Sequence, residues 1–163
     1  MSNMVSADRV SVNKVSVNKV SVNKIQLEHT YQQCKTIIDS EVKYKLMGWI
    51  YRVLLDKSMQ DGLFFCEKDD QQIIGFALCR KLTRKGIISI DKIGVHPQYR
   101  RQGIGQVLIN RVKQLGLPVK LDVTANNQTA IRFYLKNGFQ ITGTKVLGQQ
   151  TQVLTMTLAN SPQ

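Results

Sequence analysis

Between residues 31 and 57 the apolar positions recur at spacings of mostly three or four, which is the repeat of an amphipathic helix. The pair Asp39-Ser40 interrupts this run, and because both residue types favour helix caps, the pattern predicts two helices instead of one. Residues 25–28 precede the run and are predicted to form a short first strand. Asp61-Gly62 follows the run as a turn signal.

The middle of the chain has the pattern of β-structure. Residues 62–68 and 73–82 are largely apolar and are separated by a turn at 69–72, so they are predicted to pair as a hairpin. Residues 86–95 are predicted to form the next strand. The two helices are therefore followed by three consecutive strands.

The pattern then alternates between helices and strands. Apolar residues recur every three or four positions from 104 to 115, which predicts a helix running to Gly116. A second helix, capped by Asn126 or Asn127, is predicted to end at Asn137-Gly138. The remaining predicted strands are 119–123, 139–146 and 152–158. Because hairpins and crossovers are mixed, we predict an α/β (α+β) fold.

The first 24 residues repeat a five-residue unit. Residues 10–14, 15–19 and 20–24 each have the sequence VSVNK, and residues 5–9 have the degenerate copy VSADR. Valine is the only apolar residue of the VSVNK unit, so the segment buries too little surface to offset the entropy of ordering it. We predict a flexible or weakly β-forming extension over 1–24, with a basic arm that touches a partner as the alternative. The folded domain is predicted over 25–163.

Composition limits the class of protein. Of the 163 residues, 42% are apolar and 21% are charged, as in soluble globular domains. No stretch approaches the ~20 apolar residues that span a bilayer, and the N-terminus has no apolar segment of the kind found in secretory signals. Three cysteines without close spacing fit neither a disulfide framework nor a zinc site. We therefore expect reduced thiols in a cytoplasmic protein, with no membrane partner and no metal.

The net charge of +12 is unevenly distributed. Residues 71–163 contain thirteen Lys and Arg but only two acidic residues, Asp91 and Asp122, whereas residues 25–70 contain six basic and eight acidic ones. The second half should therefore attract an anion. Nucleic acid and a phosphate-bearing cofactor both fit, and charge alone does not choose between them.

The sequence of residues 95–105, VHPQYRRQGIG, indicates where an anion binds. The first N–H groups of the helix that follows lack partners and carry the positive end of its dipole. Gly103 and Gly105 allow close approach to the backbone, while Arg100 and Arg101 add forked donors suited to phosphate. A diphosphate fits these features, and a tight turn with two solvated arginines is the alternative.

This motif is neither a Rossmann fingerprint, which needs a third glycine, nor a P-loop, which needs Gly-Lys-Ser/Thr. Residues 100–105 instead resemble the Gln/Arg-x-x-Gly-x-Gly/Ala signature of the GNAT superfamily of N-acetyltransferases. Residues 93–97 resemble the end of that family's fourth strand, and the segments 121–123, Asn127-x-x-Ala130 and 133–139 resemble its second sequence block. The likeness is close over 87–140 and extends to the order of elements over 25–160.

The resemblance implies a mixed, mostly antiparallel sheet whose fourth and fifth strands, here 86–95 and 119–123, splay apart to hold acetyl-coenzyme A (acetyl-CoA). The pantetheine arm would pair with Ile93 and Val95 like an added strand, and Asn127 would bond to that arm. The pyrophosphate would meet a run of neighbouring residues, which are Arg100, Arg101, Gln102, Gly103, Ile104 and Gly105.

The resemblance also implies direct acetyl transfer to an amine. A backbone N–H at a bulge in the fourth strand would stabilise the thioester oxygen, and we place it at Val95. Tyr134 matches the residue that lies against the cofactor and protonates the leaving thiolate; a purely structural core aromatic is its alternative. Asp91 lies where the family often has a carboxylate and is the candidate base, with a surface ion pair with Lys92 as its alternative. Glu67 is a weaker candidate, and water can serve instead.

The family's acceptor site implies that an amine binds between the first two helices and the last hairpin. The negative balance of residues 25–70 favours a cationic amine, on a small molecule or a protein. Two other functions stay open: a CoA-binding sensor without catalysis, and an acetyltransferase that acts on an RNA-bound amine, which the basic second half motivates. No helix-turn-helix or zinc pattern points to DNA. A monomer and a homodimer are both compatible with the sequence.

Overall fold

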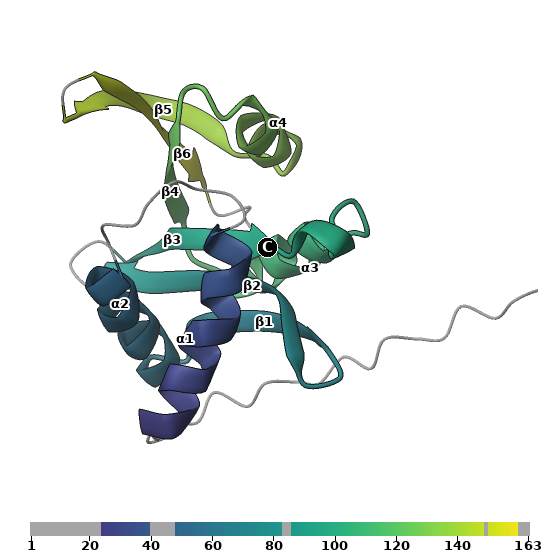
Figure 1. Cartoon of the computed structure of the whole chain (residues 1–163). Helices are drawn as coiled ribbons and strands as arrows, with labels where there is room; N and C mark the ends of the chain where they lie inside the picture. Colours follow the sequence, from purple (N-terminus) through teal and green to yellow (C-terminus); the bar gives the residue numbers. More distant parts are fainter. Residues whose placement is uncertain (1–23, 40–47, 83–85, 149, 160–163) are drawn as a thin grey trace, which may run out of the picture.

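The computed structural model describes residues 24–39, 48–82, 86–148 and 150–159 (Figure 1). The helices are α1 (Lys24–Asp39), α2 (Gly48–Gln60), α3 (Ile104–Lys113) and α4 (Gln128–Lys136), with a 3-10 turn η1 (Pro97–Tyr99) before α3. The strands are β1 (Phe64–Asp69), β2 (Gln72–Leu82), β3 (Ile87–Val95), β4 (Val119–Thr124), β5 (Gln140–Leu147) and β6 (Thr151–Leu158). These six strands begin and end within two residues of the bounds predicted from residue 62 onward.

Residues 25–28, predicted as a strand, lie in the first turns of α1, so that prediction is wrong. Leu27 packs against the core beneath the first two helices, together with Tyr31, Cys34 and Ile37. The spacing of these four residues is that of one helical stripe, which extends back through the predicted strand. A four-residue segment carries too little pattern to separate strand from helix. The described part of α1 ends at Asp39, and the predicted break at Asp39-Ser40 lies in part outside the described residues.

Six strands form one sheet in the order β1-β2-β3-β4-β6-β5. Only β3 and β4 pair in parallel, and the other neighbouring strands are antiparallel, as predicted. The parallel pairing joins Ile88, Ser89 and Ile90 to Val119, Lys120 and Leu121 and goes no further. Beyond these residues β3 and β4 diverge (Figure 1), which confirms the predicted splay.

Helices cover both faces of this sheet. Phe76 and Leu78 of β2 belong to a buried cluster with α1 and α2, whereas Ala77 and Cys79 belong to a second cluster with α3 and α4. Because successive side chains of a strand point to opposite faces, α1 and α2 lie on one face and α3 and α4 on the other (Figure 1). The sheet therefore separates the anion motif at α3 from the helices predicted to bind the acceptor.

The predicted extension, residues 1–24, lies outside the described residues except for Lys24, the first residue of α1. The division of the chain at residue 25 therefore stays a prediction. None of the helices in the described ranges is long and apolar enough to cross a bilayer.

Candidate active site

The loop between β3 and α3 carries the predicted anion motif. Gly103 precedes the helix with a φ of 84°, and its position has no side-chain cap. The first intrahelical hydrogen bond is donated by the Val107 N–H to the Gly103 carbonyl, at 3.0 Å. The N–H groups of Ile104, Gly105 and Gln106 therefore have no partner in their own helix and lie at the positive end of its dipole. This end of α3 can bind an anion through its backbone.

The loop itself is bent and anchored. Arg101 has a φ of 61°, in the left-handed region, which costs a residue with a side chain about 1 to 2 kcal/mol. The Tyr99 hydroxyl donates to Asp69 Oδ2 at 2.7 Å, and this hydrogen bond raises the pKa of Tyr99. Arg100 Nε donates to the Val95 carbonyl at 3.1 Å. Strained backbone conformations persist only where the surrounding structure holds them, and they occur mainly at ligand sites. The strain at Arg101 therefore agrees with the anion site that the motif predicts in this loop.

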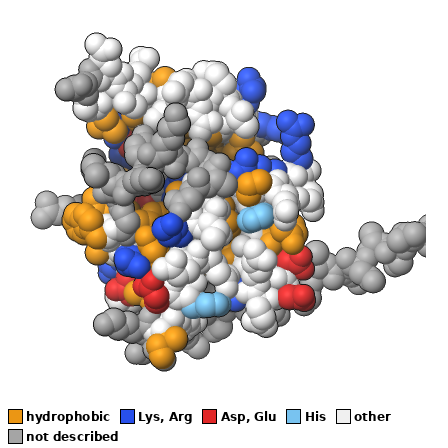
Figure 2. Space-filling model, viewed as in Figure 1, with side chains coloured by type: hydrophobic (Ala, Val, Ile, Leu, Met, Phe, Trp, Pro, Cys, Tyr) orange, Lys and Arg blue, Asp and Glu red, His pale blue; other side chains and the backbone are white. Residues whose placement is uncertain are grey.

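Both signs of charge appear on the visible surface. Figure 2 shows Lys and Arg side chains over α4 and toward the loop before α3, and others beside the acidic side chains over the first helices; further Asp and Glu side chains lie at the tip of the β1–β2 hairpin. Arg100 and Arg101 in the loop and Arg132 and Lys136 on α4 are exposed. Part of the positive charge of residues 71–163 is therefore presented near the anion motif.

A β-bulge interrupts β3 on its side facing β2. Leu78 of β2 pairs with Lys92, but the next residue, Cys79, pairs with Ile90. Asp91 is therefore the extra residue of β3. A bulge shifts the alternation of a strand by one position, so the residues after Asp91 face in the opposite direction from the one expected of a regular strand.

The bulge decides which backbone groups face the splay. Before it, the Ile88 N–H points toward β4 and donates to the residue that precedes β4, at 2.8 Å. After it, the His96 N–H points the other way and donates to a β2 carbonyl at 2.8 Å. Since peptide groups alternate along a strand, Ile93 and Val95 present theirs to the side that β4 has left. The family resemblance led us to expect a backbone N–H for the thioester oxygen at Val95, beside a bulge. The bulge lies four residues earlier, and its effect reaches Val95 through this alternation.

Helix α4, which follows β4, brings two of the predicted site residues. Tyr134 is 6% exposed, and its ring lies between those of Phe133 and Phe139, with centroid distances of 5.4 and 5.5 Å. Asn127 caps the helix, because its Oδ1 accepts from the Ala130 N–H at 3.1 Å. An amide that accepts through oxygen still has N–H donors for a ligand. Packing therefore fixes the phenol, and the cap leaves the exposed Asn127 able to donate.

Close packing seats the first turn of α3 on the sheet. A Cβ added at Gly75 of β2 would lie 2.5 Å from Cγ2 of Ile104. A Cβ at Gly105 would lie 3.4 Å from the Phe133 ring of α4, which is an ordinary contact. Gly75 was not among the residues predicted from the sequence to shape the site, although a lone glycine inside an apolar strand indicates that another element approaches closely.

Asp91, the predicted base, is held by neighbours on the face of α1 and α2. Arg80 donates to both carboxylate oxygens, with Nη2 at 2.7 Å from Oδ1 and Nε bonded to Oδ2. The Ser89 hydroxyl also donates to Oδ1, at 3.2 Å. The side chain of Asp91 is 9% exposed and that of Arg80 is 40% exposed. The sequence suggested Lys92 as the ionic partner, whereas the structure shows the pair with Arg80 on the neighbouring strand.

The remaining titratable candidates are less suited to acyl transfer. Burial raises the pKa of Cys34 and Cys66 and raises that of Cys79 to about 12, so the nucleophilic thiolate forms are suppressed. Glu67 is paired with Arg111 at 2.7 Å. Within the described ranges, no three His, Cys, Asp or Glu residues lie together as metal ligands would.

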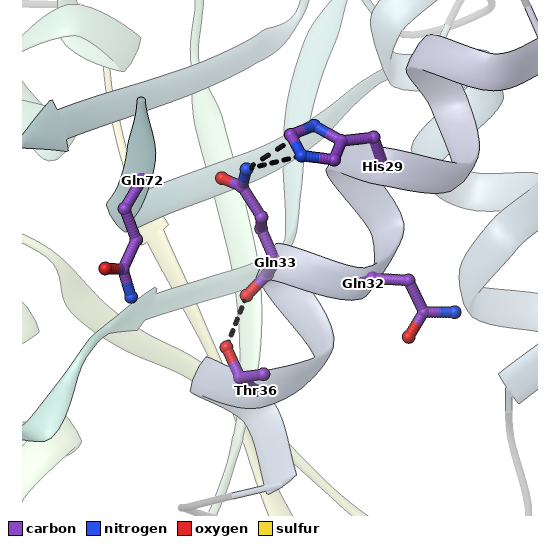
Figure 3. Close-up of a pocket in the computed structure, with 5 residues that line it drawn as sticks. All are labelled: His29, Gln32, Gln33, Thr36 and Gln72. Atoms are coloured by element: carbon purple, nitrogen blue, oxygen red, sulfur yellow. Dashed lines mark hydrogen bonds between the residues drawn. The ribbon is translucent and has the colours of Figure 1, made fainter. Parts of the chain in front are cut away.

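A hollow of about 320 Å³ lies apart from the motif, between α1 and the start of β2 (Figure 3). Its lining residues are His29, Gln32, Gln33, Thr36 and Gln72. Gln33 links the two elements, because its Oε1 accepts from the Ile73 N–H at 2.7 Å and its Nε2 lies 3.2 Å from His29 Nε2. The lining side chains are amides, a hydroxyl and an imidazole that bond mainly to their neighbours. Through Gln33, these bonds hold α1 to the hairpin.

Sequence comparison finds N-acetyltransferases. An uncharacterized N-acetyltransferase of Methanocaldococcus jannaschii is 32% identical over 108 residues, which are 60% of this chain and 47% of the relative. A peptidyl-lysine N-acetyltransferase of Salmonella typhimurium is 31% identical over 98 residues, which are 57% of this chain and 63% of the relative. The chain thus spans about half to two thirds of the length of these curated relatives.

Structural comparison covers more of the chain. The crystal structure of the ribosomal-protein-S18-alanine N-acetyltransferase from Escherichia coli matches with a TM-score of 0.68 at 20% identity, over 88% of this chain and 94% of that chain. At this low sequence identity, the structural similarity shows that the two chains share a fold. The sequence profile described as the acetyltransferase (GNAT) family matches residues 25–139, which include the splayed strands, the anion motif and α4. The chain therefore belongs to the acetyltransferase (GNAT) family.

Proposed function

We propose that the chain is an N-acetyltransferase that moves the acetyl group of acetyl-CoA to a primary amine by direct attack. The observation that carries the proposal is the path along β3, where Ile93 and Val95 face the splay and lead to the uncapped first turn of α3. An extended molecule with a diphosphate at one end fits this path, because its arm can pair with a strand and its phosphates can meet helix N–H groups. Acetyl-CoA has this form.

The residues present have suitable donors for each part of that molecule. The pantetheine arm pairs with the backbone of Ile93 and Val95, and Asn127 donates to it. The pyrophosphate accepts from the backbone N–H groups of residues 101–105, with the side chains of Arg100 and Gln102 beside them. Because most of these contacts are made by the backbone, their strength depends on where the sheet holds α3.

The chain's own groups would then support the transfer. Bound acetyl-CoA supplies a thioester whose carbonyl carbon the amine attacks, after which the C–S bond breaks. The Val95 N–H donates to the oxygen that gains negative charge. Tyr134 gives its phenolic proton to the departing thiolate and is reprotonated by the proton that the amine releases.

Asp91 is proposed as the base that takes a proton from the ammonium form of the acceptor before the attack, so that a neutral amine reaches the thioester. Both of its oxygens accept from Arg80, and because each carboxylate oxygen has two lone pairs, the ion pair leaves room on Oδ2 for a proton. A positioned base contributes about 10²- to 10⁴-fold. In this role Asp91→Asn lowers kcat by at least 10²-fold, whereas Arg80→Met, which keeps the carboxylate, lowers kcat less. Equal losses in the two variants would assign proton removal to water and leave Asp91 as a structural partner of Arg80.

The acceptor is proposed to be an amine on a protein. The S. typhimurium relative is named for peptidyl lysine and the E. coli structure for a ribosomal-protein alanine. The negative balance of residues 25–70 favours a cationic acceptor. Peptides with a free N-terminus or a lysine are therefore the first acceptors to offer, followed by polyamines and aminoglycosides.

The test is release of free thiol from acetyl-CoA across that panel of amines, with Tyr134→Phe beside the wild type. Turnover with one class of amine, lowered about 10²-fold in the variant, is the expected result. Tyr31→Phe is the matched control, because Tyr31 is an equally buried phenol (5% exposed) in the cluster under α1 and α2.

Two other outcomes would change the assignment. Tight binding of CoA without turnover on any amine would favour the sensor. Turnover only on an aminoacylated RNA, with binding that weakens steeply with salt, would favour an RNA-bound acceptor.

A further inference from the structure

Asn137, the residue that follows α4, is a buried amide between two helices. Its relative exposure is 5%, and its side chain faces the packed interior instead of solvent. Its Nδ2 donates to the Phe133 carbonyl at 2.9 Å, and its backbone N–H donates to the Phe133 and Tyr134 carbonyls at 3.2 and 3.0 Å. The residue is therefore bonded to the last turn of the helix that carries Tyr134.

The same residue is bonded to α3. Gln106, in the first turn of α3, donates from Nε2 to Asn137 Oδ1 at 2.6 Å. Lys113, the last residue of α3, donates from Nζ to the Asn137 carbonyl at 2.8 Å. Both ends of α3 thus reach one residue, and the buried side-chain amide of Asn137 uses its oxygen and its nitrogen in bonds to different helices.

These bonds lie where the sheet has stopped holding the two halves of the site together. Pairing between β3 and β4 ends at Ile90 and Leu121. Beyond that point the anion motif follows β3 and Tyr134 follows β4, with no strand hydrogen bonds between the two. The distance between α3 and α4 must then be set by side chains, and a hydrogen-bonded buried amide fixes geometry more narrowly than apolar contacts do.

We propose that Asn137 is a positioning residue that sets the place of Tyr134 relative to the cofactor-binding turn of α3, acting through Gln106. The inference rests on the proposed function, in which Tyr134 protonates the leaving thiolate. Asn137 touches neither the thioester nor the amine in this role. Its contribution is to keep the phenol within proton-transfer distance of a sulfur atom whose position α3 determines.

Loss of the amide should affect the chemical step more than binding. A misplacement of about 1 Å at a reacting group can lower the rate about 10²-fold. Asn137→Ala is therefore expected to lower kcat by about 10- to 100-fold while the KM for acetyl-CoA changes less than about 3-fold, because the N–H groups of α3 remain in place. Gln106→Ala removes the same hydrogen bond from the α3 side. Because Gln106 is only half-buried, this is the variant to use if Asn137→Ala does not fold.

Asn110→Ala is the matched control. Asn110 Oδ1 accepts from the other hydrogen of the Gln106 amide, at 3.0 Å, but lies on α3 and makes no bond to α4. This variant therefore disturbs Gln106 without cutting the link to Asn137, and its kcat is expected to stay within about 2-fold of the wild type.

The deciding comparison repeats Asn137→Ala in a Tyr134→Phe background. If Asn137 acts by placing the phenol, adding Asn137→Ala to Tyr134→Phe lowers kcat by less than about 2-fold, because the phenol is already gone. The same loss in both backgrounds, or a loss in Asn110→Ala as large as that in Asn137→Ala, would overturn the proposal and leave a general effect on stability.

Failure of the proposed function is recognised separately. If the wild type turns over no amine, the acetyltransferase assignment fails, and hydrogen exchange of the α4 amides then tests the link itself. Faster exchange over residues 128–136 in Asn137→Ala than in Asn110→Ala supports a link between the helices, and unchanged exchange overturns it.

Discussion

Replacing Gly75 by alanine tests how the sheet places the loop and the first turn of α3, to which we assign cofactor binding. Gly75 of β2 lies opposite Val95 of β3, and a Cβ there would lie 2.5 Å from Ile104 Cγ2, where ordinary contacts begin at 3.4 Å. The shortfall of 0.9 Å (3.4 minus 2.5) has to be removed by movement. Ile104 cannot remove it by rotation, because one χ1 rotamer dominates for isoleucine in a helix. The first turn of α3 must therefore move away from the sheet.

Two quantities follow from this displacement. Overpacking costs about 1 to 3 kcal/mol, and the exchange of Gly for Ala in a strand returns about 0.5 to 1 kcal/mol. The expected net loss of stability is then on the order of 1 kcal/mol. Moving the helix N–H groups by nearly the same distance removes the equivalent of one charge-assisted hydrogen bond, about 1.5 to 3 kcal/mol. Binding of CoA is therefore expected to weaken about 10- to 100-fold.

Isothermal titration calorimetry with CoA and thermal unfolding measure the two effects. The double variant Gly75→Ala/Ile104→Ala removes the obstructing methyl while keeping the Ile104 N–H, so its CoA affinity should equal that of Ile104→Ala alone. Wild-type affinity in Gly75→Ala, or a double variant that binds as weakly as Gly75→Ala, would refute the view that this contact sets the position of α3.

Three further predictions concern other parts of the molecule. Gly103→Ala places a side chain at a φ of 84°, so it should lower the free energy of unfolding by about 1 to 2 kcal/mol in urea denaturation; an unchanged midpoint would contradict this. Burial raises the pKa of Cys79 to about 12, so this thiol should react with Ellman's reagent at pH 8 far more slowly in the native protein than in guanidinium, and rapid native labelling would count against it. Burial raises the pKa of Asp122, but hydrogen bonds from Lys145 and Thr155 outweigh it and lower the pKa below its usual value. A depressed pKa gives stability that is present above the unfolded pKa and is lost as pH falls through the folded one, so Lys145→Met should lose less stability than the wild type between pH 5 and pH 2; parallel curves would argue against the pair.

Local signals in the sequence determined most of the elements and the anion motif. Asn127 was one of two candidate caps, and it caps α4 through the Ala130 N–H. Gly138 was predicted to end that helix in the left-handed region, and its φ is 87°. Each of these features depends on residues within about four positions of one another, which is the reach of helix hydrogen bonds and caps. The weakest local pattern, residues 25–28, is also the one that was assigned wrongly.

Only the tertiary structure decided which groups meet across the sheet. The bulge at Asp91 turns Val95 toward the splay, yet nothing in the sequence of β3 marks the extra residue, because a bulge depends on how two strands fit together. Arg80 lies 11 residues from Asp91, and Gln106 lies 31 residues from Asn137. Strand register and helix packing depend on many contacts at once, so residues this far apart have no pattern that pairs them. The sequence by itself therefore determined the family and the position of the candidate anion motif along the chain, whereas the packing of β2, α3 and α4 determined how the elements that carry the candidate site are held.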